Sequence, residues 1–154
     1  MYKLISKILA NRLKRVLAAM IDDSQSAFVL GRLIIDNVFV AFEPMHYIDQ
    51  RKKGKEVLMA TKLNMSKAND RVEWVYLEAM MRKMGFHEKW ISLIMMCVST
   101  VSYSLLINEE PKGKITPSRG LHQGDPISPY LFLLCAEGLS AMLKKEEREG
   151  DCSQ

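Results

Sequence analysis

Apolar residues recur at helical spacing through most of the chain. Near the amino terminus they stand three or four positions apart, which predicts an amphipathic helix over residues 2–20. In a second such pattern, over residues 33–50, we expect Val38, Phe42 and Met45 to face inward. Pro44 lies inside that pattern and predicts a kink or an early stop, because proline removes a helical hydrogen bond. Three further helices are predicted over residues 72–84, 87–98 and 129–149.

Two other segments have the patterns of β-strands. Residues 57–65 are apolar on both faces and predict a buried strand, in which Lys62 and Asn64 share one face. Residues 101–108 and 113–116 predict a hairpin. Its turn looks weak, because Asn108 is followed by Glu and not by the glycine that tight hairpin turns favour. We find no repeat and no second domain, so one domain is predicted.

The chain has 154 residues and a formal net charge of +4, but its basic residues are unevenly spread. Residues 1–20 contain no acid, and residues 51–55 form a second basic cluster. Clusters of this kind suit contact with phosphates. A solvated helix face and a basic surface turn would have the same composition. The basic residues of the two clusters are Lys3, Lys7, Arg12, Lys14 and Arg15, then Arg51, Lys52, Lys53 and Lys55.

Other features exclude several classes of protein. The three cysteines are far apart and form no Cys-x-x-Cys pair, which indicates neither a zinc site nor a disulfide framework. Such thiols are typical of a reducing intracellular compartment, nuclear or cytoplasmic. No apolar run reaches 18 residues and no signal peptide is visible, so no membrane segment is expected. The basic first helix would also suit a membrane surface.

The segment 119–132, RGLHQGDPISPYLF, is the most informative part of the chain. Gly120 and Gly124 allow a left-handed backbone or a close approach to a ligand. Pro126 stiffens the exit of the loop, and Ser128 is placed to cap the helix that follows. A rigid loop that leads into a helix is suited to hold a phosphate or a nucleotide. An ordinary surface loop before a core helix has the same composition.

This loop closely resembles the template- and nucleotide-gripping motif of reverse transcriptases, in the form found in plant LINE-type (non-LTR) retrotransposons. Four other segments resemble the same family in the same order. They are residues 2–17 with K-x-L-A-N-R-L, residues 24–37 with Gly-Arg, residues 60–74 with KLNMSKANDRVEW, and residues 84–113. The resemblance implies an α+β fold, a partial right-hand polymerase with several helices packed on a small antiparallel sheet. Residues 1–56 would be fingers-like, and residues 57–154 would be palm-like.

The resemblance also implies a chemistry. Reverse transcriptases extend a DNA primer on an RNA template with deoxynucleoside triphosphates, using two Mg²⁺ ions about 4 Å apart. Two positions depart from the family pattern: Asn64 replaces the catalytic aspartate, and Asn69 replaces the aromatic residue that screens the sugar. The family's second acidic motif, an aromatic-Ala-Asp-Asp turn, is expected beyond Gln154. We therefore predict poor Mg²⁺ binding and a catalytically inactive chain, since Asn64 offers Mg²⁺ only a neutral carbonyl oxygen.

Further residues receive roles only through the resemblance. Gln123 is expected to reach the incoming nucleotide, and Gly124 to let the backbone approach it. Asn69 would lie under the sugar, and Arg32 would clamp triphosphate oxygens. Template and primer would contact three basic residues, Lys62, Lys67 and Arg119. Arg119 could equally pair with a surface acid, and Asp70 is expected to cap the helix that begins near Val72. Three functions therefore stay open: a polymerase fragment, a nucleic-acid-binding remnant without catalysis, or a relic without function.

Overall fold

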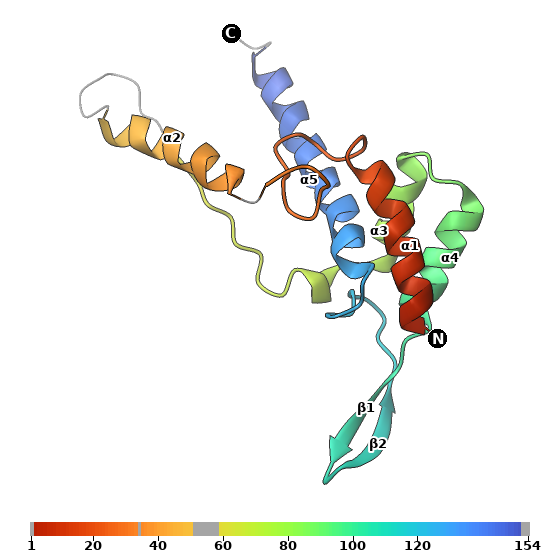
Figure 1. The fold of residues 1–154 in the computed structure, drawn as a ribbon. Helices are drawn as coiled ribbons and strands as arrows, with labels where there is room; N and C mark the ends of the chain where they lie inside the picture. Colours follow the sequence, from red (N-terminus) through yellow and green to blue (C-terminus); the bar gives the residue numbers. More distant parts are fainter. Residues whose placement is uncertain (1, 34, 51–58, 152–154) are drawn as a thin grey trace.

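The computed structural model describes residues 2–33, 35–50 and 59–151. Along these residues the chain forms helices and one β-hairpin, so the predicted α+β class is confirmed (Figure 1). The helices are α1 (Tyr2–Leu17), α2 (Asp36–Gln50), α3 (Trp74–Lys83), α4 (Glu88–Ser99) and α5 (Ser128–Asp151), with a 3₁₀ turn η1 at Asn69–Arg71. The strands are β1 (Tyr103–Ile107) and β2 (Glu110–Ile115).

Helices α1, α3, α4 and α5 pack around one apolar core. Each contributes side chains at helical spacing, and α5 packs against α1 and α3 (Figure 1). Burying each such side chain contributes about 1.5–3 kcal/mol. The large side chains with no more than 1% of their surface exposed are Leu13, Leu17, Leu77, Met81, Ile91, Ile94, Ile127, Leu131 and Leu134.

Helix α1 turns a narrower face to the core than its sequence predicted. Leu9, Leu13 and Leu17 are buried, whereas Ile5 and Ile8 remain almost half exposed. The lysines and arginines lie mostly on the exposed side, as expected from amphipathic spacing. This helix therefore joins the core by one stripe and presents cations to solvent by another.

The hairpin forms despite its unfavourable turn sequence. Asn108 and Glu109 both adopt a left-handed backbone, with φ of 50° and 67°, and β2 begins directly at Glu110. Both central residues of a type I′ turn need this conformation, and Glu109 adopts it against its intrinsic preference. The second strand thus starts three residues earlier than the sequence predicted. The hairpin projects away from the helices, and Leu105, Leu106 and Ile107 are exposed (Figure 1).

The apolar pattern of α2 predicted a buried face, and this prediction was wrong, because α2 buries no residue. Of the kink and the early stop predicted at Pro44, the early stop is absent, since the helix continues to Gln50. Val38, Phe42 and Met45, which were expected to face a core, are each about 60% exposed. Helical spacing makes a helix amphipathic, but a buried face also requires a packing partner, and α2 stands apart from the four-helix cluster (Figure 1).

The predicted strand over residues 57–65 is not formed in its described part. Residues 59–65 are irregular and exposed, and Leu63 has 72% of its surface exposed. A strand needs a neighbour for its backbone N–H and C=O groups, and the sheet in the described chain consists of β1 and β2 alone. Residues 57 and 58, and the basic turn predicted at 51–55, lie outside the described residues.

Burial in the core predicts that substitutions at two positions of α3 lower the stability by very different amounts. Leu77 is fully buried, whereas Val75, two residues earlier, is 80% exposed. Leu77→Ala should lower the free energy of unfolding by about 2–5 kcal/mol, because it leaves a cavity. Val75→Ala should change it by less than about 0.5 kcal/mol. Urea denaturation followed by circular dichroism measures both, and similar losses would contradict this packing.

Candidate functional site

The loop between β2 and α5 is held at its beginning by Gly120. The Gly120 N–H donates to the Val72 carbonyl oxygen at 2.8 Å, and its own carbonyl accepts from the Trp74 indole Nε1–H at 2.8 Å. Its φ is +90°, and a Cβ atom there would lie 3.0 Å from the backbone oxygen of Asp70. Only glycine fits this place without strain. One residue further, the Leu121 N–H donates to the Asn69 carbonyl oxygen at 2.9 Å.

The end of the loop is held by Asp125, which is buried. The Tyr2 hydroxyl donates to Asp125 Oδ2 at 2.6 Å, and the Ser6 hydroxyl donates to Oδ1. Burial, and then the bond to Asp125, raise the pKa of the Tyr2 phenol above its usual range. Three residues later Ser128 begins α5, and its N–H donates to the Asp125 carbonyl oxygen at 3.2 Å. Ser128 is thus the first helical residue, one position earlier than predicted.

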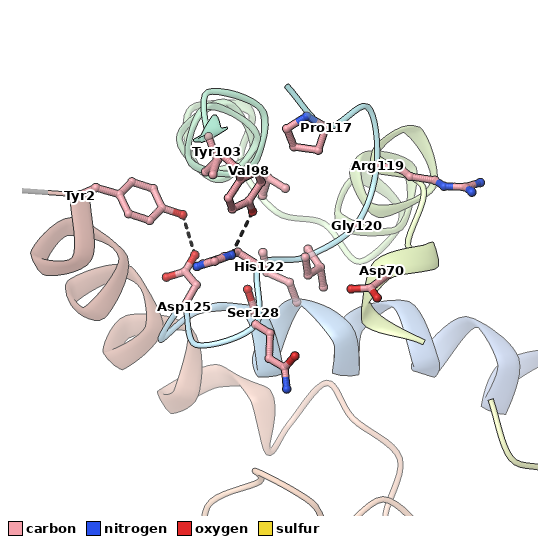
Figure 2. A pocket seen from close by; sticks show the side chains of 14 residues that line it. Tyr2, Asp70, Val98, Tyr103, Pro117, Arg119, Gly120, His122, Asp125 and Ser128 are labelled. Carbon is pink, nitrogen blue, oxygen red and sulfur yellow. Dashed lines mark hydrogen bonds between the residues drawn. The ribbon is translucent and has the colours of Figure 1, made fainter. Parts of the chain in front are cut away.

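A cavity of about 320 Å³ lies beside this loop (Figure 2). The Tyr103 and His122 rings face each other with centroids 5.3 Å apart, and the Tyr103 oxygen lies 3.0 Å from His122 Nδ1. Aromatic rings, polar side chains and backbone amides together suit a planar, hydrogen-bonding ligand. We call this space the loop cavity. Its polar or aromatic lining residues are Tyr2, Asp70, Tyr103, Arg119, His122, Gln123, Asp125 and Ser128.

The loop presents its predicted contact residues to solvent. His122, Gln123 and Gly124 are exposed, and they lie between the two fixed ends of the loop. Gly124 has a φ of +92°, with nothing within 4 Å of the place a Cβ would occupy. This open, left-handed position would let the backbone approach a ligand, and the roles of Gln123 and Gly124 stay predictions.

Asn64 lies elsewhere, in an open groove of about 560 Å³ along α3 and α5. Phe132, Cys135 and Leu139 of α5 line this groove, which we call the Asn64 groove. Gln123 lines the loop cavity and Asn64 lines the groove, so the structure does not bring the two positions into one site. Residues 68–73 contribute to both spaces, with Asp70 on the loop cavity and Glu73 on the groove.

The three predicted contact residues on either side of Asn64, which are Lys62, Lys67 and Asn69, are exposed. Asn69 lies in η1, and its backbone carbonyl supports Leu121. Lys62 lies in the irregular segment, and Lys67 adopts a left-handed backbone with a φ of 51°. The prediction that Asp70 caps the following helix was wrong, because the cap position of α3 is Glu73, which makes no side-chain cap bond.

Arg119 forms an ion pair with Glu73 at 3.1 Å. Its guanidinium points away from Tyr2 and Asp125 in Figure 2. Both side chains are 59% exposed, so the pair is weak and is easily exchanged for another anion. The two alternatives for Arg119, a surface ion pair and a phosphate contact, are therefore compatible.

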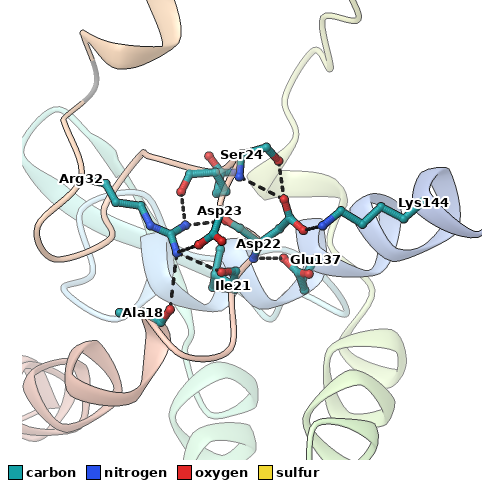
Figure 3. A network of polar contacts seen from close by, with 9 residues as sticks. Ala18, Ile21, Asp22, Asp23, Ser24, Arg32, Glu137 and Lys144 are labelled. Atoms are coloured by element: carbon teal, nitrogen blue, oxygen red, sulfur yellow. Dashed lines mark hydrogen bonds and ion pairs between the residues drawn. The ribbon is translucent and has the colours of Figure 1, made fainter. Parts of the chain in front are cut away.

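Arg32 holds the segment after α1 together (Figure 3). Its Nη1 donates to the carbonyls of Asp22 and Gln25, and its Nη2 lies 3.2 Å from the Ile21 carbonyl and 3.0 Å from Asp23 Oδ1. In the same segment after α1, the Asp22 carboxylate contacts Lys144 of α5. Lys144, and then Ser24, hold the pKa of Asp22 well below its usual range.

The described residues do not provide a place for a pair of divalent metal ions. Among them, no group of three or more His, Cys, Asp or Glu side chains is placed to hold a metal. Asn64 is neutral, and Asp70 lines the loop cavity and not the Asn64 groove. Mg²⁺ requires several oxygen ligands with negative charge among them, so these residues do not fit two such ions.

Sequence reasoning missed the residues that fix the loop. Asp125 was noticed only as part of a Gln-Gly-Asp string, and Tyr2 and Trp74 received no role. Tyr2 is 123 positions from Asp125, so no local pattern could connect them. The polar residue Ser6 among the apolar positions of α1 was a signal in the sequence that α1 has a buried polar partner.

The chain belongs to the reverse transcriptase (RNA-dependent DNA polymerase) family, whose pattern matches residues 1–152. It is 31% identical over 144 residues to the uncharacterized 149 kDa protein of transposon TX1 of Xenopus laevis, covering 94% of this chain and 11% of that protein. The predicted kinship with reverse transcriptases of LINE-type (non-LTR) retrotransposons is confirmed.

Two further relatives match parts of the chain. An uncharacterized mitochondrial protein of Arabidopsis thaliana is 56% identical over 45 residues, which cover 29% of this chain and 37% of that protein. A retrovirus-related Pol polyprotein from the type-1 retrotransposable element R2 of Popillia japonica is 28% identical over 102 residues, covering 66% of this chain and 17% of that protein. The chain therefore spans less than two fifths of the length of these relatives.

Substitution of Gly120 and of Gly124 by alanine should lower the free energy of unfolding by unequal amounts. Gly120→Ala and Gly124→Ala should each lose about 1–2 kcal/mol of stability to the left-handed backbone. Gly120→Ala should lose more, because its new Cβ meets a backbone oxygen that cannot rotate away, whereas the space at Gly124 is open. Urea denaturation of the two variants tests this, and equal losses would show that Gly120 is not confined by Asp70.

Proposed function

We propose that this chain is one partial reverse transcriptase domain that retains a grip on nucleic acid and nucleotide but no longer transfers nucleotides. In this proposal residues 1–56 correspond to fingers, and residues 57–154 to the front of the palm. The observation that carries the proposal is the loop cavity, which has both ends of its loop fixed while Asn64 lies in a different space. The family activity would be RNA-directed extension of a DNA primer.

The surface around the loop cavity supports binding of nucleic acid. Helix α1 brings one cation to the same place, since Tyr2 lines the loop cavity and Lys3 lines a cavity next to it. Gln123, with two donors and an acceptor oxygen on an exposed turn, suits a nucleotide edge. Arg119 can release Glu73 for a phosphate, and Lys62 and Lys67 add exposed charge.

The role carried over for Arg32 has the least support among these residues. A triphosphate clamp needs free guanidinium N–H groups. Here both terminal nitrogens of Arg32 already donate to backbone carbonyls, so a triphosphate would have to displace these bonds.

The expected loss of catalysis follows from the missing negative charge at position 64. Reverse transcriptases generally use Mg²⁺, and the family's aspartate would supply a negative oxygen where this chain has the carboxamide of Asn64. Asn69 is likewise smaller than the aromatic ring of the family, so any restored activity would exclude ribonucleotides poorly. The neutral side chain of Asn64, and not the extent of the chain, is the reason to expect no catalysis.

Binding is tested by fluorescence anisotropy of a labelled RNA–DNA template–primer over a salt series. We expect saturable binding that weakens as salt rises and that is tighter than binding to an unstructured RNA of equal length. Gln123→Ala should weaken it, whereas the control Lys145→Ala, at the far end of α5, should leave the preference unchanged. Absent or indiscriminate binding would favour a relic without function.

Metal dependence tests the lost chemistry separately. Titration of the ligand-free chain with MgCl₂ should show only weak Mg²⁺ binding, because the described residues form no metal site. Asn64→Asp should strengthen Mg²⁺ binding by about fivefold, the scale of one ion pair in water. Asn108→Asp, the same charge change on the hairpin turn, is the matched control. Equal behaviour of the two variants would show that Asn64 is not the missing ligand position.

A further inference from the structure

Asp125 is a buried acid that the proposed grip does not itself use. Only 6% of its surface is exposed, and the ion pairs found among the described residues do not include it. Its side-chain partners are two hydroxyl groups, one from Tyr2 and one from Ser6, both on α1. A buried carboxylate is costly unless hydrogen bonds replace its water.

The two hydroxyls come from one side of α1. Tyr2 and Ser6 are four residues apart, so successive turns of the helix place them above one another. The Tyr2 oxygen also lies 3.2 Å from the carbonyl oxygen of Cys97 in α4. The nearby start of α5 favours the negative charge of Asp125, but α1 supplies the side-chain hydrogen bonds. The loop and α1 therefore meet at this carboxylate (Figure 2), and α4 contacts the Tyr2 hydroxyl that binds it.

We propose that Asp125 is a positioning residue, which fixes the exposed Gln123 turn against α1 through Tyr2 and Ser6. The Asp125 N–H donates to the His122 carbonyl oxygen at 3.3 Å, so the turn closes directly onto the anchored residue. With Gly120 fixed at the other end, residues 122–124 are held between two anchors. The consequence for ligand binding rests on the proposed function, because an ordered loop loses less entropy when it binds.

Amide hydrogen exchange resolved by NMR tests the anchor in the free chain. Tyr2→Phe and Asp125→Asn should each speed exchange of the Asp125 and Ser128 amides by about tenfold, the scale of one hydrogen bond to a charged group. The Gly120 amide, in the other anchor, should change less. Tyr76→Phe is the matched control, since it removes a partly buried tyrosine hydroxyl that donates to the Cys135 carbonyl away from the loop.

Combination of the two loop variants separates a direct contact from general damage. Tyr2→Phe should add less to Asp125→Asn than it does to the unaltered chain, because the neutral carboxamide leaves only a weaker, uncharged hydrogen bond for Tyr2→Phe to remove. Fully additive effects, or loop exchange no faster than in Tyr76→Phe, would overturn the proposal. These outcomes need no ligand, so they decide the anchor even if the unaltered chain binds no template–primer.

Affinity then tests the positioning role. Asp125→Asn should weaken template–primer binding severalfold, and more than Tyr76→Phe, which removes a hydroxyl hydrogen bond away from the loop. Faster loop exchange with unchanged affinity would overturn positioning. Lack of binding by the unaltered chain would instead overturn the proposed function and leave the exchange result standing.

Discussion

The position of the candidate site depends on one backbone contact. Gly120 is bonded through both its N–H and its carbonyl to the segment that leads into α3, and it approaches the Asp70 backbone too closely for any side chain. This contact joins the β2–α5 loop to η1, although the two are about fifty residues apart. It also determines which residues of 68–73 face the loop cavity and which face the Asn64 groove. A change at Gly120 would therefore disturb both spaces together.

The arrangement explains how binding and catalysis can separate in this chain. The loop is held by hydrogen bonds from α1, η1 and α3 and by the core residues Ile127 and Leu131, none of which involves Asn64. In the proposed function, an asparagine in place of aspartate at position 64 would thus leave these contacts intact. The segment around Asn64 has no strand partner in the described chain and stays exposed, so it adds little to stability. The Gln123 loop is part of the packed structure, whereas the segment around Asn64 is not.

Sequence patterns predicted the helices and the loop, but they did not predict burial. Apolar spacing predicted the ends of the four packed helices to within a few residues. Gly120 and Gly124 indicated positions with a left-handed backbone. The same reasoning wrongly predicted burial for α2 and for residues 59–65. Spacing shows which face of an element is apolar, but it does not show whether another element covers that face. The contact between Tyr2 and Asp125 was invisible for a related reason. It is created by tertiary packing of α1 against the loop, and neither residue is unusual in its local context.

The central proposal is that the Gln123 loop is the place where this member of the reverse transcriptase family holds nucleic acid. Photocrosslinking of a template–primer with a photoreactive base at the primer terminus, followed by peptide mapping, tests this most directly. The account predicts crosslinks concentrated in residues 117–128 and in the first turns of α1, which share the loop cavity and its neighbour. Crosslinks spread evenly along the chain, or confined to the exposed end of α5, would contradict it.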